Sequence, residues 1–169
     1  MKSKRAVEAA FALAAFLAAG DALAQGVLRK SSKENAPKPT ECEIRTAFAL
    51  DYGEYLPGQA ATLNGSAAVT TRCNHGNTAL TLSAGPSFNT GSVMNRALRE
   101  VGGNDLLHYQ LYIDTAHVTI WGDGVNGGQP FRRVVPASTQ SFTFHGAIGA
   151  GQSVSTGDYA DRITIVVMP

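Results

Sequence analysis

Two cysteines, Cys42 and Cys73, are the residues of this 169-residue sequence with the most distinctive chemistry. Neither belongs to a CxxC motif, which argues against a thiol–disulfide oxidoreductase. Two thiols without a nearby pair of histidines also make a poor zinc site. In an oxidising compartment an even pair most simply forms one disulfide. Closing a loop of about 30 residues would stabilise the fold by roughly 3.6 kcal/mol.

The four histidines, His75, His108, His117 and His145, are scattered along the chain. A hairpin would bring His108 close to His117, and two imidazoles could begin a metal site. Surface histidines with ordinary hydrogen-bond partners are the simpler interpretation. We therefore predict neither a metal site nor a cofactor.

The acidic residues and glycines do not indicate a catalytic centre either. Asp105, Asp114 and Asp123 occur where turns are expected, and nothing places two of them across one cleft, as a glycosidase requires. Residues 122–127 match the letters GxGxxG, but Pro130 soon follows and opposes the helix start that a dinucleotide site needs. The motifs GxSxG, HExxH and GxxxxGK[ST] do not occur. We predict no enzyme and no catalytic residue; an exported hydrolase is the least favoured hypothesis.

The N-terminus has the composition of a secretory signal peptide. A basic start at residues 2–5 precedes an apolar run at residues 6–19, and Ala22-Leu23-Ala24 has the small-x-small pattern that signal peptidase recognises. We expect cleavage after Ala24, with Gln25 as the mature N-terminus. The apolar run is shorter than the about 20 residues of a membrane span. We therefore expect an exported protein without a span of its own.

Charge and composition divide the remaining chain into an extension and a body. All five lysines precede residue 40, whereas the chain from Cys42 onward has seven arginines and nine acidic residues. Residues 25–41 contain too few apolar side chains to offset the entropy of ordering, which predicts a flexible extension. Residues 42–169 are expected to form one domain. The nearly balanced charge argues against nucleic-acid binding.

Alternation of apolar and polar residues predicts β-strands throughout the body. The clearest runs are residues 78–83, 107–113, 118–121, 142–144 and 163–167. Turn residues separate these runs, and a short helical turn is expected only around residues 93–99. Several short strands at this spacing predict an all-β sandwich or barrel.

Six aromatic residues allow two interpretations, a sugar-binding platform or a packed core: Trp121, Tyr52, Tyr55, Tyr109, Tyr112 and Tyr159. In a β-sandwich, aromatic residues at alternate positions more often pack in the core with a hydroxyl group at its rim. The sequence therefore favours core packing.

Short motifs follow one another along the body in a distinctive order. They include Tyr52, Gly53 and Tyr55 after Cys42, then Tyr109, then Trp121 with Gly122, and finally Gly157 with Tyr159. Their order and spacing resemble the spore coat protein U domain family, which is shared with subunits of archaic chaperone–usher pili. The resemblance covers nearly the whole body.

The resemblance implies an incomplete immunoglobulin-like β-sandwich in which Cys42 is bonded to Cys73. It also implies a periplasmic chaperone, an outer-membrane usher and other pilus or coat subunits as partners, and a final location at the cell surface. In family members that polymerise, an added β-strand fills the open groove. We predict a structural subunit of a surface fibre or coat that assembles in this way; the alternative is a terminal adhesin for a glycan or surface.

The extension departs from the pattern of a donor strand. Between Gln25 and Glu41 only Val27, Leu28 and Ala36 are apolar, and two prolines remove backbone donors from any ladder. We therefore expect a poor donor strand and a chain that ends a fibre or joins a coat.

Overall fold

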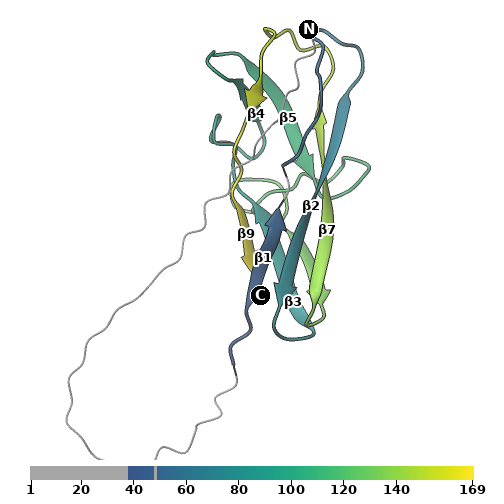
Figure 1. Cartoon of the computed structure of the whole chain (residues 1–169), viewed down its shortest axis with the longest axis vertical. Helices are drawn as coiled ribbons and strands as arrows, with labels where there is room; N and C mark the ends of the chain where they lie inside the picture. The colour runs from purple at the N-terminus through teal and green to yellow at the C-terminus, as the bar shows by residue number, and fades with distance from the viewer. Residues whose placement is uncertain (1–37, 48) are drawn as a thin grey trace, which may run out of the picture.

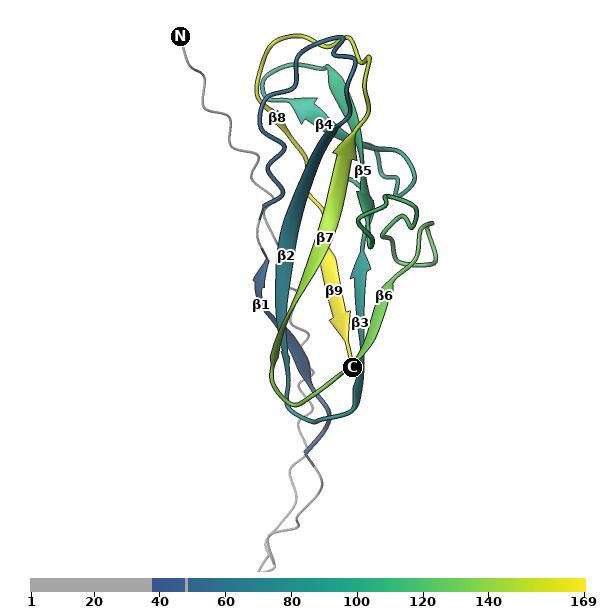
Figure 2. The ribbon, with the colours of Figure 1, turned by 90° about the vertical axis from the view of Figure 1, so that its right-hand side faces the viewer.

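The computed structural model describes residues 38–47 and 49–169, which form strands and turns without any helix. The expected signal peptide, with its cleavage site at Ala24 and Gln25, lies outside the described residues, as does most of the extension. Within the described part, nine strands form two antiparallel sheets, and Figures 1 and 2 show them as an elongated two-layered structure.

The larger sheet has six strands in the order β1-β2-β7-β5-β4-β8. Their bounds are β1 Cys42–Ala47, β2 Leu63–Cys73, β4 Arg96–Glu100, β5 Leu106–Tyr112, β7 Thr139–Ile148 and β8 Tyr159–Ala160. The two longest strands, β2 and β7, pair from Leu63 opposite Ile148 to Arg72 opposite Thr139. This long antiparallel ladder forms the middle of the sheet. On one side β1 pairs with β2, and on the other side β5 pairs with β7.

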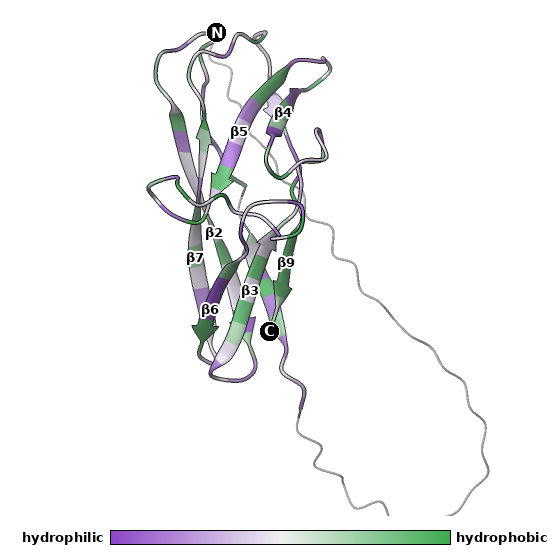
Figure 3. Ribbon diagram, turned by 180° about the vertical axis from the view of Figure 1, so that it is seen from behind, coloured by the Kyte–Doolittle hydropathy of each residue, from purple (hydrophilic) through white to green (hydrophobic). Residues whose placement is uncertain are grey.

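The smaller sheet has three strands in the order β6-β3-β9. They are β3 Thr78–Ala84, β6 Phe131–Val135 and β9 Ile165–Met168. Figure 2 shows this sheet facing β1, β2 and β7 as a second layer. Figure 3 shows β3 and β9 as largely hydrophobic, whereas β6 carries a hydrophilic stretch.

The core lies between the two layers and consists of residues at alternate positions of the strands. Leu80 and Leu82 of β3 have no solvent exposure, and Phe144 and Ile148 of β7 are buried on the opposite sheet. The period-two pattern predicted for residues 78–83, 107–113 and 142–144 is confirmed by β3, β5 and β7. Burial of these side chains is the main favourable contribution to the fold.

Two local expectations are wrong. Residues 93–99 do not form a helical turn, because Arg96–Arg99 pair with β5 as part of β4. Residues 118–121 do not form a strand, because only Ile120 and Trp121 make isolated bridges. The carboxylate of Asp114 accepts hydrogen bonds from the backbone N–H groups of Val118 and Thr119, which holds this segment in a loop.

Two glycines that face each other make room for the segment that follows β1. Gly65 of β2 pairs with Gly146 of β7 on the inner face of the larger sheet. The side chains of Leu50 and Tyr52 lie directly over Gly146, where a Cβ atom would collide with the Tyr52 hydroxyl. Tyr52 can pack directly against the sheet because Gly65 and Gly146 have no side chains at this point.

We predict that Gly146→Ala destabilises the protein by about 2 kcal/mol, since an added methyl group forces Tyr52 and Leu50 out of their packed positions. Gly149→Ala is the matched control, because a Cβ atom at Gly149 meets nothing within 4 Å. Thermal unfolding of both variants measures the difference. Equal melting temperatures for the two variants would show that Tyr52 is not fixed by this contact.

Candidate binding groove between two sheet edges

The strands β1 and β9 are neighbouring edges of different sheets. β1 pairs only with β2, and β9 pairs only with β3, among the described residues. The two strands come into contact, but no ladder joins them, and Figure 1 shows them side by side. Each therefore has one side whose backbone N–H and C=O groups have no partner strand in the described structure.

The inward side chains of both edges are only half-buried. Ile44 and Ala47 of β1, together with Ile165 and Val167 of β9, pack against the core without being covered completely. Inward residues in the middle of the smaller sheet, such as Leu82, are fully buried. The apolar core is therefore incompletely covered along the line between β1 and β9.

An apolar cavity of about 70 Å³ continues this opening into the core. Leu50 and Tyr52, which follow β1 in the chain, belong to its lining, as do Asp161 and Ile163, which precede β9, and Ile165, the first residue of β9. We refer to the two facing edges with this cavity as the β1–β9 groove. Two unpaired strand edges beside an apolar cavity suit an extended peptide segment with apolar side chains on one face.

Buried polar groups border the groove near its cavity. The Tyr109 hydroxyl donates a hydrogen bond of 2.7 Å to the Asp161 carboxylate, which also accepts from the backbone N–H groups of Asn89 and Arg162. Burial, reinforced by the charge of Asp161, raises the pKa of Tyr109 above its ordinary value. The ring of Tyr52 packs edge-to-face on Tyr109, with 6.0 Å between the centroids. Burial also raises the pKa of Tyr52, so both hydroxyl groups remain protonated at neutral pH, and of the two only that of Tyr109 bonds to Asp161.

Arg96 is fully buried behind this cluster and connects the two sheets. Its guanidinium group donates to the carbonyl oxygens of Val93 and Gly85 and to the side-chain oxygen of Gln110, at distances of 2.6–3.0 Å. Gly85 directly follows β3, whereas Gln110 belongs to β5. Burial lowers the pKa of Arg96, and the nearby Tyr109 and Asp161 oppose this shift. One buried side chain thus holds the end of β3 against the larger sheet.

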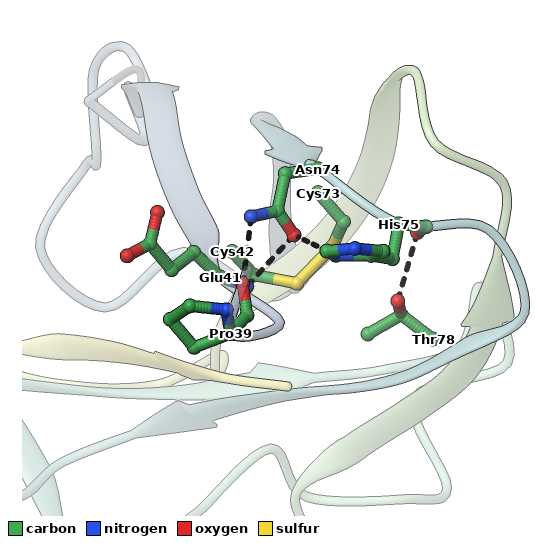
Figure 4. Close-up of a disulfide and its surroundings, with 7 residues drawn as sticks. All are labelled: Pro39, Glu41, Cys42, Cys73, Asn74, His75 and Thr78. Atoms are coloured by element: carbon green, nitrogen blue, oxygen red, sulfur yellow. Dashed lines mark hydrogen bonds between the residues drawn. A yellow bond between two sulfur atoms is a disulfide. The ribbon is translucent and has the colours of Figure 1, made fainter. Parts of the chain in front are cut away.

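A disulfide between Cys42 and Cys73 fixes β1 to β2, as predicted. The two residues are direct partners in the ladder, with 4.2 Å between their Cα atoms. Figure 4 shows Asn74 beside the disulfide. The Asn74 side chain donates a hydrogen bond to the carbonyl oxygen of Pro39 and accepts one from the N–H of Glu41. The backbone N–H of Asn74 also donates to the carbonyl oxygen of Glu41. The chain entering β1 is therefore held to β2 by one covalent bond and three hydrogen bonds.

Trp121 belongs to the core and does not form an exposed platform. It is 3% exposed and stacks on Phe144 with 3.6 Å between the ring centroids. Its indole N–H donates to the carbonyl oxygen of Leu82, so the ring bonds to one sheet while stacking on the other. Tyr52, Tyr55, Tyr109 and Tyr159 are also buried, which supports core packing for these aromatic residues.

The other motif residues lie in connections next to the larger sheet, except Tyr159, which begins β8. The Tyr55 hydroxyl accepts from the N–H of Gln152, and the Tyr159 hydroxyl donates to the carbonyl oxygen of Ser155. Gly53 is in the turn between Tyr52 and Tyr55, and Gly157 lies against the side chain of Glu100. These four residues, together with Tyr52, line one small cavity of about 30 Å³, so the fold brings five of the motif residues together.

Gly122 follows Trp121 at a point where the chain crosses itself. A Cβ atom at Gly122 would collide with the carbonyl group of Gly127, and the N–H of Gly122 donates to the carbonyl oxygen of Gln129. The GxGxxG letters at residues 122–127 thus belong to a loop, as expected. The carboxylate of Asp123 accepts from two backbone N–H groups of this loop and from the side chain of Asn126, the contact that contributes most to lowering the pKa of Asp123.

The ring contact between two histidines that the structure shows joins His117 to His145. The ring of His117 lies 4.9 Å from the ring of Tyr112 and 6.2 Å from the ring of His145, measured between centroids. His75 and His108 are exposed, and His108 lines the same open hollow as His117. In the described part of the chain, no three metal-binding side chains of the His, Cys, Asp or Glu type lie together.

Sequence reasoning missed several residues of the groove. Arg96 and Asp161 gave no signal, because charged residues are assumed to be exposed unless a partner is known. The half-buried Ile165 and Val167 were found only as a strand, since period-two alternation does not reveal which edge lacks a neighbour.

Within residues 38–47 and 49–169, no helix has the length and apolarity of a membrane span.

We predict that reducing the Cys42–Cys73 bond lowers the free energy of unfolding by about 3.6 kcal/mol, because the unfolded chain regains the entropy of an open loop of about 30 residues. Urea unfolding with and without reductant measures the change. The double variant Cys42→Ser/Cys73→Ser is the control and should not respond to reductant. An unchanged unfolding midpoint for the reduced wild type would contradict the prediction.

We predict that Arg96→Met costs about 3 kcal/mol, because the carbonyl group of Gly85 loses the Arg96 donor and that of Val93 keeps only Gln110. The matched control is Arg132→Met on β6, where the arginine is exposed. Urea unfolding of both variants provides the comparison. A cost below about 0.5 kcal/mol for Arg96→Met, the range of surface substitutions, would show that Arg96 does not hold the sheets together.

Comparison with known proteins places this fold in a family. The Spore Coat Protein U domain matches residues 33–166. The "Protein U" of Myxococcus xanthus is 28% identical over 175 aligned positions, which cover 96% of this chain and 94% of that protein.

A solved structure shares the fold. The crystal structure of the CsuC–CsuE chaperone–tip adhesion subunit pre-assembly complex, from archaic chaperone-usher Csu pili of Acinetobacter baumannii, contains a chain that matches with a TM-score of 0.51 and 21% identity. The match covers 76% of this chain but only 40% of that chain. The likeness, together with the all-β architecture and the single disulfide, confirms the predicted fold class. The chain belongs to the Spore Coat Protein U domain family.

Proposed function

We propose that this protein is an exported structural subunit of a bacterial surface coat or chaperone–usher fibre, and that it assembles by accepting a β-strand from another molecule. The observation that carries the proposal is the β1–β9 groove, in which two unpaired strand edges flank an apolar opening into the core. We place the domain at residues 42–169, after a cleaved signal peptide and a short extension.

Strand addition at this groove has a direct physical basis. Backbone hydrogen bonds to β1 or β9 would provide affinity, and apolar side chains that enter the opening would provide specificity. Figures 1 and 2 show β1 and β9 running in opposite directions, so an inserted strand would be parallel to one and antiparallel to the other. Covering Ile44, Ile165 and Val167 would complete the burial of the core.

The proposed partners are a periplasmic chaperone, an outer-membrane usher and other coat or fibre subunits. Family membership and the solved chaperone–subunit complex support this choice. The chaperone would protect the groove until a subunit strand replaces it, since an exposed edge next to apolar surface promotes aggregation. The mature protein would then reside at the cell surface.

The extension at residues 25–41 supports an acceptor role more than a donor role. It offers only three apolar side chains, and its prolines interrupt a ladder. A chain that accepts a strand without donating one fits the end of a fibre or a coat. The adhesin alternative also fits a terminal position, but the burial of Trp121 removes the aromatic platform suggested for it.

We predict that peptides with alternating apolar residues raise the melting temperature of the isolated mature protein, and that Val167→Lys abolishes this effect. Val167 faces the groove, and a lysine there would block entry of the strand. Val166→Lys is the matched control, because Val166 is the neighbouring residue on the outer face of β9. Thermal melting with and without peptide measures the response for all three proteins.

Two results would contradict the proposal. One is an isolated wild-type chain that is stable and monomeric and does not respond to any peptide of the panel. The other is an equal loss of peptide response in both lysine variants, which would show that the peptide does not bind between β1 and β9. Far-UV circular dichroism confirms that each variant retains its sheet structure before the comparison is made.

A further inference from the structure

The hydroxyl group of Tyr52 is buried without a hydrogen-bond partner. Tyr52 is 6% exposed, and its hydroxyl is one of two such side-chain groups among the described residues, together with Nε of Arg96. Most buried polar groups in folded proteins have a partner, because an unsatisfied donor loses the hydrogen bonds that water provided. This single atom therefore requires an explanation.

The position of Tyr52 suggests where a partner would enter. Tyr52 lines the cavity of the β1–β9 groove together with Leu50, Ile163 and Ile165. The cavity measures about 70 Å³, whereas roughly 10–15 Å³ of such volume admits one water molecule. There is consequently room beside Tyr52 for the end of a side chain.

The polar neighbour across the cavity already has its partners. The carboxylate of Asp161 accepts hydrogen bonds from Tyr109, Asn89 and Arg162, so the described structure gives it three donors. Burial raises the pKa of Tyr52 above its ordinary range, which keeps the hydroxyl protonated and able to donate. What the Tyr52 hydroxyl lacks is an acceptor, since neither Asp161 nor His145, the other ionisable residues of the lining besides Tyr109, bonds to it.

We propose that the strand accepted by the β1–β9 groove carries one hydrogen-bond-accepting side chain, of the Ser, Thr, Asn or Gln type, at the inward position that reaches the Tyr52 hydroxyl. This inference rests on the proposed function and specifies its ligand. The other inward positions of the strand are apolar, because most of the remaining lining is aliphatic or aromatic, with Asp161 and His145 as the exceptions.

One polar position would fix the register of the added strand. Side chains of a strand alternate between its two faces, so shifting the strand by two residues keeps the apolar face inward. The shift moves the polar side chain to a place where nothing satisfies it, and it leaves the Tyr52 hydroxyl without an acceptor. The groove thereby discriminates against a register that apolar side chains alone would tolerate.

The test uses peptides in which asparagine replaces valine at one inward position at a time. With wild-type protein, asparagine should weaken binding at every inward position except one, where it should bind about tenfold more tightly than valine. With Tyr52→Phe, the preference for asparagine at that position should disappear. Tyr112→Phe is the control, since Tyr112 does not line the cavity, and it should retain the wild-type preference. Isothermal titration calorimetry measures the affinities.

The outcomes separate this inference from the proposed function. If valine binds best at every inward position in both wild type and Tyr52→Phe, the inference is wrong, while strand acceptance stands. If no peptide binds wild-type protein, the proposed function fails and the inference fails with it. If Tyr52→Phe does not fold, the ¹³Cζ chemical shift of Tyr52 in labelled wild-type protein shows whether the peptide side chain bonds to the Tyr52 hydroxyl. It should differ between the complexes with the asparagine and valine peptides, and equal shifts would overturn the inference.

Discussion

Backbone groups at a sheet edge need hydrogen-bond partners, and this constraint determines how the two layers of the protein meet. Five of the nine described strands have a neighbour on both sides, whereas β1, β6, β8 and β9 are edges with one neighbour each. Of these edges, β1 and β9 come into contact across the two sheets. Completing both ladders inside one chain would require a further strand between them. The described residues do not supply it, and the proposed function assigns this role to a strand from another molecule.

Contacts on both sides of the groove hold each edge strand in its place. On the side of β1, the Cys42–Cys73 bond and the Asn74 side chain fix the strand to β2. On the other side, β9 is held by its ladder to β3, and Trp121 connects β3 to Phe144 of the larger sheet. These contacts are covalent or buried, so they fix each edge strand within its own layer.

The sequence predicted the parts of the structure that depend on local chemistry. The period-two runs of β3, β5 and β7, the disulfide, and the loop at residues 122–127 could all be anticipated from side-chain types and spacing. The strand β4 could not, because its formation depends on pairing with β5 and on the buried Arg96, which are contacts between distant residues. Likewise, the unsatisfied Tyr52 hydroxyl is visible only once Gly65 and Gly146 are known to be neighbours.

The position of the disulfide has a mechanical consequence. Cys42 is the first residue of β1, and Cys73 is the last residue of β2, the strand that pairs with β7 along almost its whole length. Tension applied to the chain before Cys42 therefore passes through the sulfur atoms directly into β2. The hydrogen bonds of β1 beyond Cys42 carry little of that load, so pulling from this end would not peel β1 away from its sheet. Force would instead act along the ladder between β2 and β7, where many hydrogen bonds must break together.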